Sequence, residues 1–114
     1  MPLTVSEVIL KISPHPSRSG YASLQRAAEI VVKRGVYRHG TLMSEIYPQV
    51  AEETGKTRDQ VSRSIARATK EIWESEGIEE MKKLLGKPFF AKPSPGDMIF
   101  YLAYIATEGK LLED

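Results

Sequence analysis

The sequence predicts an all-α fold, a compact six-helix domain that contains a helix-turn-helix. Apolar residues recur at steps of three and four, which is the spacing of amphipathic helices. Glycines, prolines and capping motifs divide the chain into stretches of helical length, and no segment shows the clear alternation of a strand. The chain has 114 residues, of which 41% are hydrophobic, enough for one core. We therefore expect residues 1–114 to form a single domain.

The N-terminal part is predicted to form two helices. Thr4 can cap the first, whose apolar stripe consists of Val5, Val8, Ile9 and Ile12. The two prolines within residues 13–17 end this helix, because proline cannot continue one. The second helix is expected over about residues 21–34, and Gly35 is placed to end it.

The central part is predicted to hold two short helical segments followed by a long helix. A helix start is expected near Thr41, and Pro48 then interrupts it and begins a new helix over residues 48–54. Thr57 and Gln60 form a predicted capping box, in which each side chain bonds the backbone N–H of the other residue. The helix that follows runs to about residue 75, with an apolar stripe of Val61, Ile65, Ala68 and Ile72.

The C-terminal part is predicted to hold a short helix, a connector and a last long helix. Gly77 is expected to break the preceding helix, so that the short one covers residues 78–85. Residues 87–93 contain two prolines and two adjacent phenylalanines, and we expect these aromatic rings to lie on the core. Ser94 and Asp97 form a second predicted capping box. Apolar residues surround the helix that it opens, so we expect that helix to be deeply buried or covered by a partner.

Residues 47–66 fit the twenty-residue window of a helix-turn-helix, which we predict over about residues 47–75. Ala51 stands at the fifth place, where a small residue lets two helices approach, and Gly55 at the ninth, where the turn favours glycine. Val61 stands at the fifteenth place, where an aliphatic side chain fixes the second helix. The window departs at its eighteenth place, where Ser64 replaces the usual aliphatic residue beside Ile65.

The formal net charge of +1 conceals an uneven distribution of charge. Residues 11–70 carry eleven Lys and Arg against five acidic residues, whereas residues 71–114 carry five Lys against nine acidic residues. A polyanion responds to such a local patch rather than to the total charge. The alternative interpretation of these charges is a solvated, salt-bridged helix face.

The outer face of the second helix of the motif carries the candidate DNA contacts. Arg suits guanine O6 and N7, and Gln suits adenine; the candidate base-reading residues are Gln60, Ser62, Arg63 and Arg67. Arg67, further along the helix, suits a phosphate equally well. Ala66 within this face allows close approach to a groove. The candidate phosphate contacts are Lys56, Thr57, Arg58, Lys70, Arg34 and Arg38.

The sequence holds no residue pattern typical of an enzyme, a cofactor site or a metal site. It contains no cysteine and two histidines, His15 and His39, both in predicted exposed loops. Its adjacent acidic pairs diverge on a helix and make poor acid/base dyads. We therefore expect no catalysis, cofactor or metal. No apolar run reaches the roughly 18 residues of a membrane span, and with the lack of cysteine this predicts a cytoplasmic protein without membrane contact.

Several spaced residues together resemble a known family: Gly20-Tyr21 with Leu24, Arg26 and Ala27; Ile46-Tyr47-Pro48 with Val50-Ala51; Val61, Arg63, Ile65 and Ala68; Trp73; and Ala91-Lys92-Pro93. From Val5 to Leu112 the chain is similar to the C-terminal DNA-binding effector domains of the stage-zero sporulation protein A family of response regulators. The resemblance implies a six-helix fold around a helix-turn-helix, and a bacterial transcription regulator that joins the nucleoid when bound. It implies binding to tandem short boxes on duplex DNA by a monomer that pairs head-to-tail there, with RNA polymerase as a further partner. It also implies subunit contacts by the last helix at Phe100, Tyr101 and Tyr104.

The chain departs from this family at several positions of the recognition helix. The family usually places Arg, Glu and Arg where Gln60, Ser62 and Arg63 stand, so only Arg63 carries over, and Ala66 and Arg67 also differ. The resemblance therefore implies the docking mode rather than the sequence of the box. These 114 residues have no room for a receiver domain, so we expect no phosphorylation switch within the chain. The alternative function is a protein-interaction module with the same helical fold that has lost DNA specificity.

Overall fold

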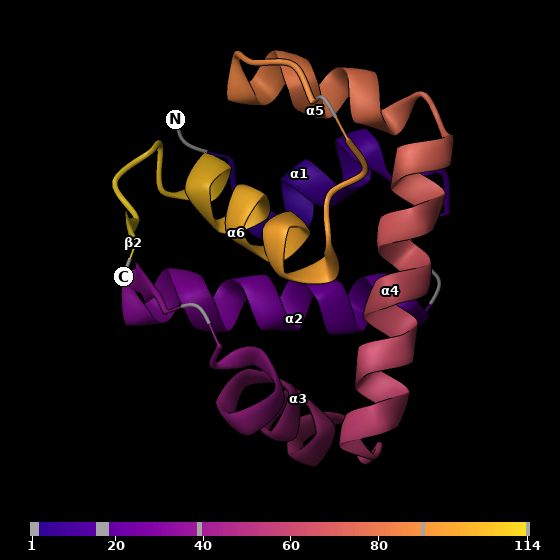
Figure 1. The fold of residues 1–114 in the computed structure, drawn as a ribbon, viewed down its shortest axis with the longest axis vertical. Helices are drawn as coiled ribbons and strands as arrows, with labels where there is room; N and C mark the ends of the chain where they lie inside the picture. The colour runs from indigo at the N-terminus through magenta and orange to yellow at the C-terminus, as the bar shows by residue number, and fades with distance from the viewer. Residues whose placement is uncertain (1–2, 16–18, 39, 90, 114) are drawn as a thin grey trace.

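Helix α2 runs across the middle of the molecule and packs against α1, α3, α4 and α6, whereas α5 packs against α1, α4 and α6 (Figure 1). The computed structural model describes residues 3–15, 19–38, 40–89 and 91–113. The described part of the chain contains six α-helices: α1 Val5–Ile12, α2 Ser19–Arg34, α3 Tyr47–Thr54, α4 Arg58–Glu74, α5 Gly77–Leu85 and α6 Pro95–Ala106. The Cα radius of gyration is 12.8 Å, close to the roughly 13 Å expected of a compact domain of this length. The predicted all-α fold is confirmed.

The core forms where the apolar faces of the helices meet on α2. In Figure 1, α6 and α3 lie on opposite sides of α2, and α4 crosses its N-terminal end. The predicted stripe of α4 is fully inside, since Val61, Ile65 and Ile72 are 0% exposed and Ala68 is 2% exposed. The predicted stripe of α1 is likewise buried. Helix α4 is therefore fixed along its length by the core, which leaves its opposite face to solvent.

Capping boxes begin three of the helices. The side chains of Thr57 and Ser94 each accept a hydrogen bond from the backbone N–H three residues later, and the side chain of that later residue accepts one in return. Both were predicted. Thr4 caps α1 in the same way, with Glu7 as its partner. Because these bonds satisfy N–H groups that have no partner within the helix, the starts of α1, α4 and α6 are set locally by the sequence.

Pro48 does not interrupt the helical segment before it, contrary to the prediction. A π-helical segment, Leu42–Ile46, runs directly into α3, and the N–H of Ile46 bonds the carbonyl oxygen of Thr41 at 3.2 Å. Pro48 lies in the first turn of α3, a position that proline readily occupies because its fixed φ suits a helix. Thr41 does not act as a side-chain cap either. Its hydroxyl donates instead to the carbonyl oxygen of Arg38 at 2.7 Å.

Gly77 is the first residue of α5 rather than a spacer between two helices. Helix α4 already ends at Glu74, where the extended backbone of Ser75 breaks it. At Gly77 a Cβ atom would overlap the backbone carbonyl oxygen of Ile12, at the end of α1. Glycine is therefore needed here because two backbone segments meet, which is a tertiary requirement that no local pattern reveals.

A two-residue parallel pairing joins β1, Val36–Tyr37, to β2, Leu112–Glu113. The sequence predicted no strand, because two residues are too short to show an alternating pattern. The pairing brings the segment after α6 back beside the end of α2, and Leu111 is 8% exposed at the edge of the core. Strand β1 is thereby held between α2 and β2.

Helix α6 is buried on one side, and aromatic rings from other segments partly cover a second side. Met98, Ile99, Leu102 and Ala103 are buried, whereas Phe100 and Tyr101 are half-buried and Tyr104 is exposed. Within this chain, the predicted deep burial is therefore found on one side of the helix. The ring of Phe89, from the connector, lies 5.1 Å from that of Tyr101, and Tyr37 lies 5.6 Å from Phe100. Phe89 is partly buried and packs against the core, so the prediction that the connector's rings lie on the core is confirmed for this residue. Tyr104 remains 39% exposed.

A few residues considered in the sequence lie outside the described part of the chain. These include Pro16, the second of the two prolines after the first helix, as well as His39 and Phe90. His15 is described, and it is exposed in a loop as predicted. Within the described residues, none of the helices has the length and apolar character needed to cross a membrane.

Candidate nucleic-acid interface

Helices α3 and α4, joined by a short turn at Gly55, span the window in which the helix-turn-helix is predicted. Gly55 lies in the turn with a left-handed backbone, φ 71° and ψ 21°, a conformation that glycine adopts without a Cβ penalty. Ala51 is 7% exposed and Val61 is fully buried where the two helices meet. At the departing place of the window, Ser64 is half-buried and the adjacent Ile65 is 0% exposed. The aliphatic residue is displaced by one position, and the motif is retained.

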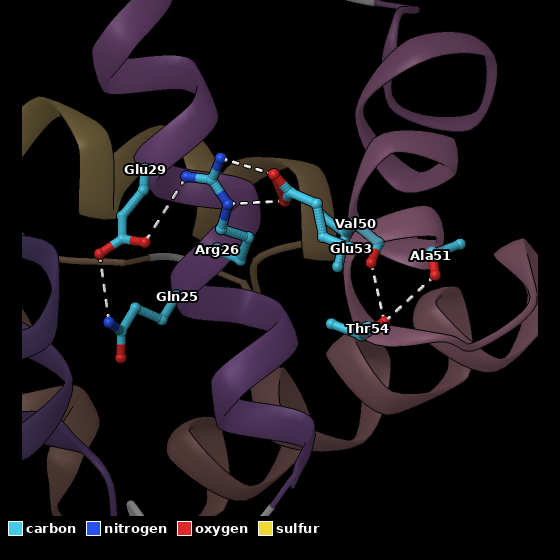
Figure 2. A network of polar contacts seen from close by, with 7 residues as sticks. All are labelled: Gln25, Arg26, Glu29, Val50, Ala51, Glu53 and Thr54. Atoms are coloured by element: carbon cyan, nitrogen blue, oxygen red, sulfur yellow. Dashed lines mark hydrogen bonds and ion pairs between the residues drawn. The ribbon is translucent and has the colours of Figure 1, made fainter.

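Helix α2 holds α3 by a paired ionic contact. Arg26 Nε and Nη2 donate to the two carboxylate oxygens of Glu53 at 2.7 and 2.8 Å, and Figure 2 shows the two side chains reaching across from α2 and α3. Glu29 lies 3.8 Å from the same guanidinium and accepts a hydrogen bond from Gln25 at 3.1 Å. The hydrogen bonds from Arg26 are the main cause of the lowered pKa of Glu53. This bidentate geometry orients α3 relative to α2 more strictly than a single contact would.

The Arg26–Glu53 pair predicts a pH dependence of stability. Because the folded state lowers the pKa of Glu53 below its ordinary 4.5, the stabilisation is present above that value and is lost as the pH falls through the lowered one. We expect Glu53→Gln to reduce the melting temperature at pH 7. The difference from wild type should shrink and vanish as the pH falls below 4.5. Thermal unfolding of both proteins between pH 7 and 3 measures this; a difference that stays constant would contradict the role of the charge.

Helix α2 also approaches the backbone of α4 closely at Gly20. A Cβ atom there would lie 2.8 Å from the carbonyl oxygen of Ser64 and 3.7 Å from the Cβ atom of Ala68. The flank of α4 that carries Ser64 therefore lies against the start of α2. We expect Gly20→Ala to destabilise the fold by about 1–3 kcal/mol because the helices must move apart. Chemical denaturation measures this loss. An unchanged denaturation midpoint would show that α2 and α4 can accommodate a methyl group at this position.

The outward face of α4 is basic. Opposite the buried stripe stand Asp59, Arg63, Ala66, Arg67 and Lys70, all exposed. Among the described residues, none provides an ion-pair partner for Arg63, Arg67 or Lys70. For these three side chains, the alternative interpretation holds in that the face is solvated but not in that it is salt-bridged. Their charges remain available to an external anion.

Four of the predicted contacts meet around one hollow of about 280 Å³ beside α4. The residues that line it are Lys56, Gln60, Arg63, Ser64 and Arg67. The sequence missed Ser64, although it stands four residues after Gln60 and three before Arg67, a spacing that places all three on one side of a helix. Ser62 stands two positions from Gln60, roughly 160° away around the helix. It is half-buried on the other flank and does not line the hollow.

The side chain of Gln60 is partly committed to the helix cap. Its Oε1 atom accepts a hydrogen bond from the backbone N–H of Thr57 at 2.9 Å, and the backbone N–H of Gln60 donates to the Thr57 hydroxyl oxygen at 3.1 Å. Paired recognition of adenine needs both the amide oxygen and the amide NH₂ group. While the cap is formed, Gln60 offers an external ligand its NH₂ group.

The other predicted phosphate contacts lie apart from this hollow. Arg34 and Arg38 line a second one, of about 340 Å³, with Val36 and Glu45. Glu45 Oε1 accepts a hydrogen bond from Arg34 Nη1 at 3.1 Å, so the charge of Arg34 is partly neutralised. Arg58 lies 3.9 Å from Asp59 in an exposed contact, which is worth little in water.

The predicted subunit-contact residues form an aromatic cluster on α6. The rings of Phe100 and Tyr101 are 5.8 Å apart, as are those of Phe100 and Tyr104. The Nζ atom of Lys87 lies 5.3 Å from the centre of the Tyr101 ring. Burial raises the pKa of Tyr101 above its ordinary value. With Tyr104 more than one-third exposed, this cluster offers a second, apolar surface.

Comparison with known proteins gives one family. The model of the family described as sporulation initiation factor Spo0A C terminal matches residues 5–105, from the start of α1 to the penultimate residue of α6. The family comprises the DNA-binding domain of a sporulation regulator and is not a family of enzymes. A search of curated proteins finds no match.

Proposed function

Because this chain belongs to the family of Spo0A C-terminal domains, which are DNA-binding domains, we propose that it recognises a short box on duplex DNA sequence-specifically and regulates transcription. Helix α4 enters the major groove by its N-terminal half, and α3 crosses the sugar-phosphate backbone. The unpaired cations on the outward face of α4 support this docking. In this proposal the protein binds its box and regulates transcription without acting as an enzyme.

Arg63 reads a guanine. It stands opposite the buried stripe of α4 and within the first two turns, where a recognition helix meets base edges. A guanidinium can donate to O6 and N7 of one guanine at the same time. Gln60 and Ser62 contact neighbouring bases from the two flanks, Gln60 by its NH₂ group.

Phosphate contacts hold the helix in the groove. Lys56, Thr57, Arg58 and Lys70 contact the backbone beside α4, and Arg34 and Arg38 extend the contact along α2 and β1. Copies of the chain occupy tandem boxes head-to-tail, with the aromatic cluster of Phe100, Tyr101 and Tyr104 in the contact between them. RNA polymerase is the further partner in the bacterial nucleoid.

We expect Lys70→Ala to weaken binding to every duplex by the same factor. A phosphate contact carries no sequence information, so the ratio of specific to random affinity should stay constant. The slope of log affinity against log salt concentration should fall by about 1. Fluorescence anisotropy at several salt concentrations measures both, and Lys83→Ala, an exposed lysine on α5, is the matched control.

Direct binding tests the proposed function. Labelled duplexes of random sequence are titrated with the protein at 50 and 200 mM salt, and affinity should fall steeply as salt rises. Failure to bind any duplex at 50 mM salt, together with tight self-association, would favour the protein-interaction module instead.

A further inference from the structure

We propose that the hollow beside α4 seats one backbone phosphate of the bound duplex, held by Lys56, Gln60, Ser64 and Arg67. The proposal rests on the proposed function. It assigns Arg67 and the NH₂ group of Gln60 to the phosphate backbone rather than to bases. It makes Ser64 a DNA contact, a role that its place in the helix-turn-helix window does not suggest. Arg63, which also lines the hollow, remains the base reader.

The chemistry of the lining fits a phosphate. Lys56 and Arg67 are donors only, and Gln60 offers its NH₂ group because its oxygen is bonded to the N–H of Thr57. Ser64 adds a hydroxyl. Within the described residues, the lining contains three cations and lacks a carboxylate. A phosphate presents several acceptors and a negative charge to such a set, whereas base edges mix donors with acceptors.

The position of the hollow on α4 gives Arg67 a different role from Arg63. Gln60 and Ser64 lie on the flank of α4 that faces α2, since the carbonyl oxygen of Ser64 lies against Gly20. The flank of a helix in the major groove faces the wall of the groove, which is lined by phosphates. Arg67 also stands one turn after Arg63, further from the end of the helix that meets the bases.

The seat is largely formed before DNA binds. The capping box fixes the side chain of Gln60, and Lys56 and Ser64 are half-buried. Neither Lys56 nor Arg67 has an ion-pair partner among the described residues, so an arriving phosphate displaces none. Binding therefore loses little to rearrangement of these groups.

Replacing single phosphates tests the seat. A duplex enriched by this protein from a random library is prepared as a series, each with one phosphate replaced by a neutral methylphosphonate. For wild type we expect one phosphate position whose neutralisation weakens binding about tenfold. For Arg67→Ala and Lys56→Ala the same neutralisation should cost less than about threefold, because the contact is already lost. Lys83→Ala should behave like wild type, and thermal unfolding should show that all variants fold.

Three results would overturn the assignment, and they are distinguishable. Arg67→Ala could relax the base preference at one position while keeping the full methylphosphonate effect, which would make Arg67 a base reader. A second result would be that the duplex binds but no single methylphosphonate weakens its binding, which would show that no phosphate is seated here. If no duplex were enriched or bound at all, the proposed function itself would fail, and the phosphate seat with it.

Discussion

Replacing Gly77 by alanine is expected to destabilise the fold by about 3 kcal/mol. The added Cβ atom would overlap the carbonyl oxygen of Ile12, and backbone atoms cannot move aside as a flexible side chain can. The start of α5 must therefore separate from the end of α1. In a domain of this size, we expect the melting temperature to fall by roughly 10 °C.

Gly86→Ala is the matched control for this substitution. Gly86 ends α5 with φ +75°, and a Cβ atom there would meet no atom within 4 Å. In the control, alanine in a left-handed backbone lowers the free energy of unfolding by about 1 kcal/mol, and no atoms overlap. Calorimetry or denaturant unfolding of both variants gives the difference. Equal losses for the two would contradict the close approach of α1 and α5.

Arg63→Ala is expected to produce the largest loss of DNA specificity. Removing a paired contact to guanine costs about 1–3 kcal/mol, or roughly 5- to 150-fold in affinity for the preferred duplex. Preference at one base pair should disappear, because the remaining side chains do not occupy the same place on α4. Affinity for random duplex should fall much less.

Arg63→Lys separates base reading from charge. Lysine keeps the positive charge but lacks the planar pair of donors that fits guanine. We expect it to retain the wild-type affinity for random duplex and to lose most of the preference at the one base pair. Competition between the preferred duplex and its single-base variants measures this. Unchanged specificity in both variants would remove Arg63 from the reading role.

The sequence predicted best those features that neighbouring residues determine. The capping boxes at Thr57 and Ser94 and the stripe of α4 depend on spacings of three and four residues, and all are confirmed. Gly77 and the β1–β2 pairing depend on segments that are distant in the sequence. The local pattern therefore predicts a helix break at Gly77, where the structure has the start of α5. It predicts no strand at β1 or β2, where the structure has a two-residue pairing.

The same division holds at the candidate interface. Gln60, Arg63 and Arg67 share a hollow because their spacing places them on one side of α4. Ser62 is predicted on the same outer face, but it lies half-buried on the other flank of the helix, roughly 160° from Gln60. The capping box predicted from Thr57 and Gln60 occupies the Gln60 oxygen, so the paired recognition of adenine predicted for Gln60 is not available while the cap is formed. The separate hollow of Arg34 and Arg38 depends on how β1 and the π-helix pack, which has no local signature.

The central claim is that the outward face of α4 reads duplex DNA. Selection of bound duplexes from a random library, sequenced after several rounds, tests it most directly when performed with wild type and with Arg63→Ala. We expect wild type to enrich a short box, present as tandem copies, and Arg63→Ala to enrich the same box with one position randomised. No enrichment by wild type, or an identical box from both proteins, would contradict the claim.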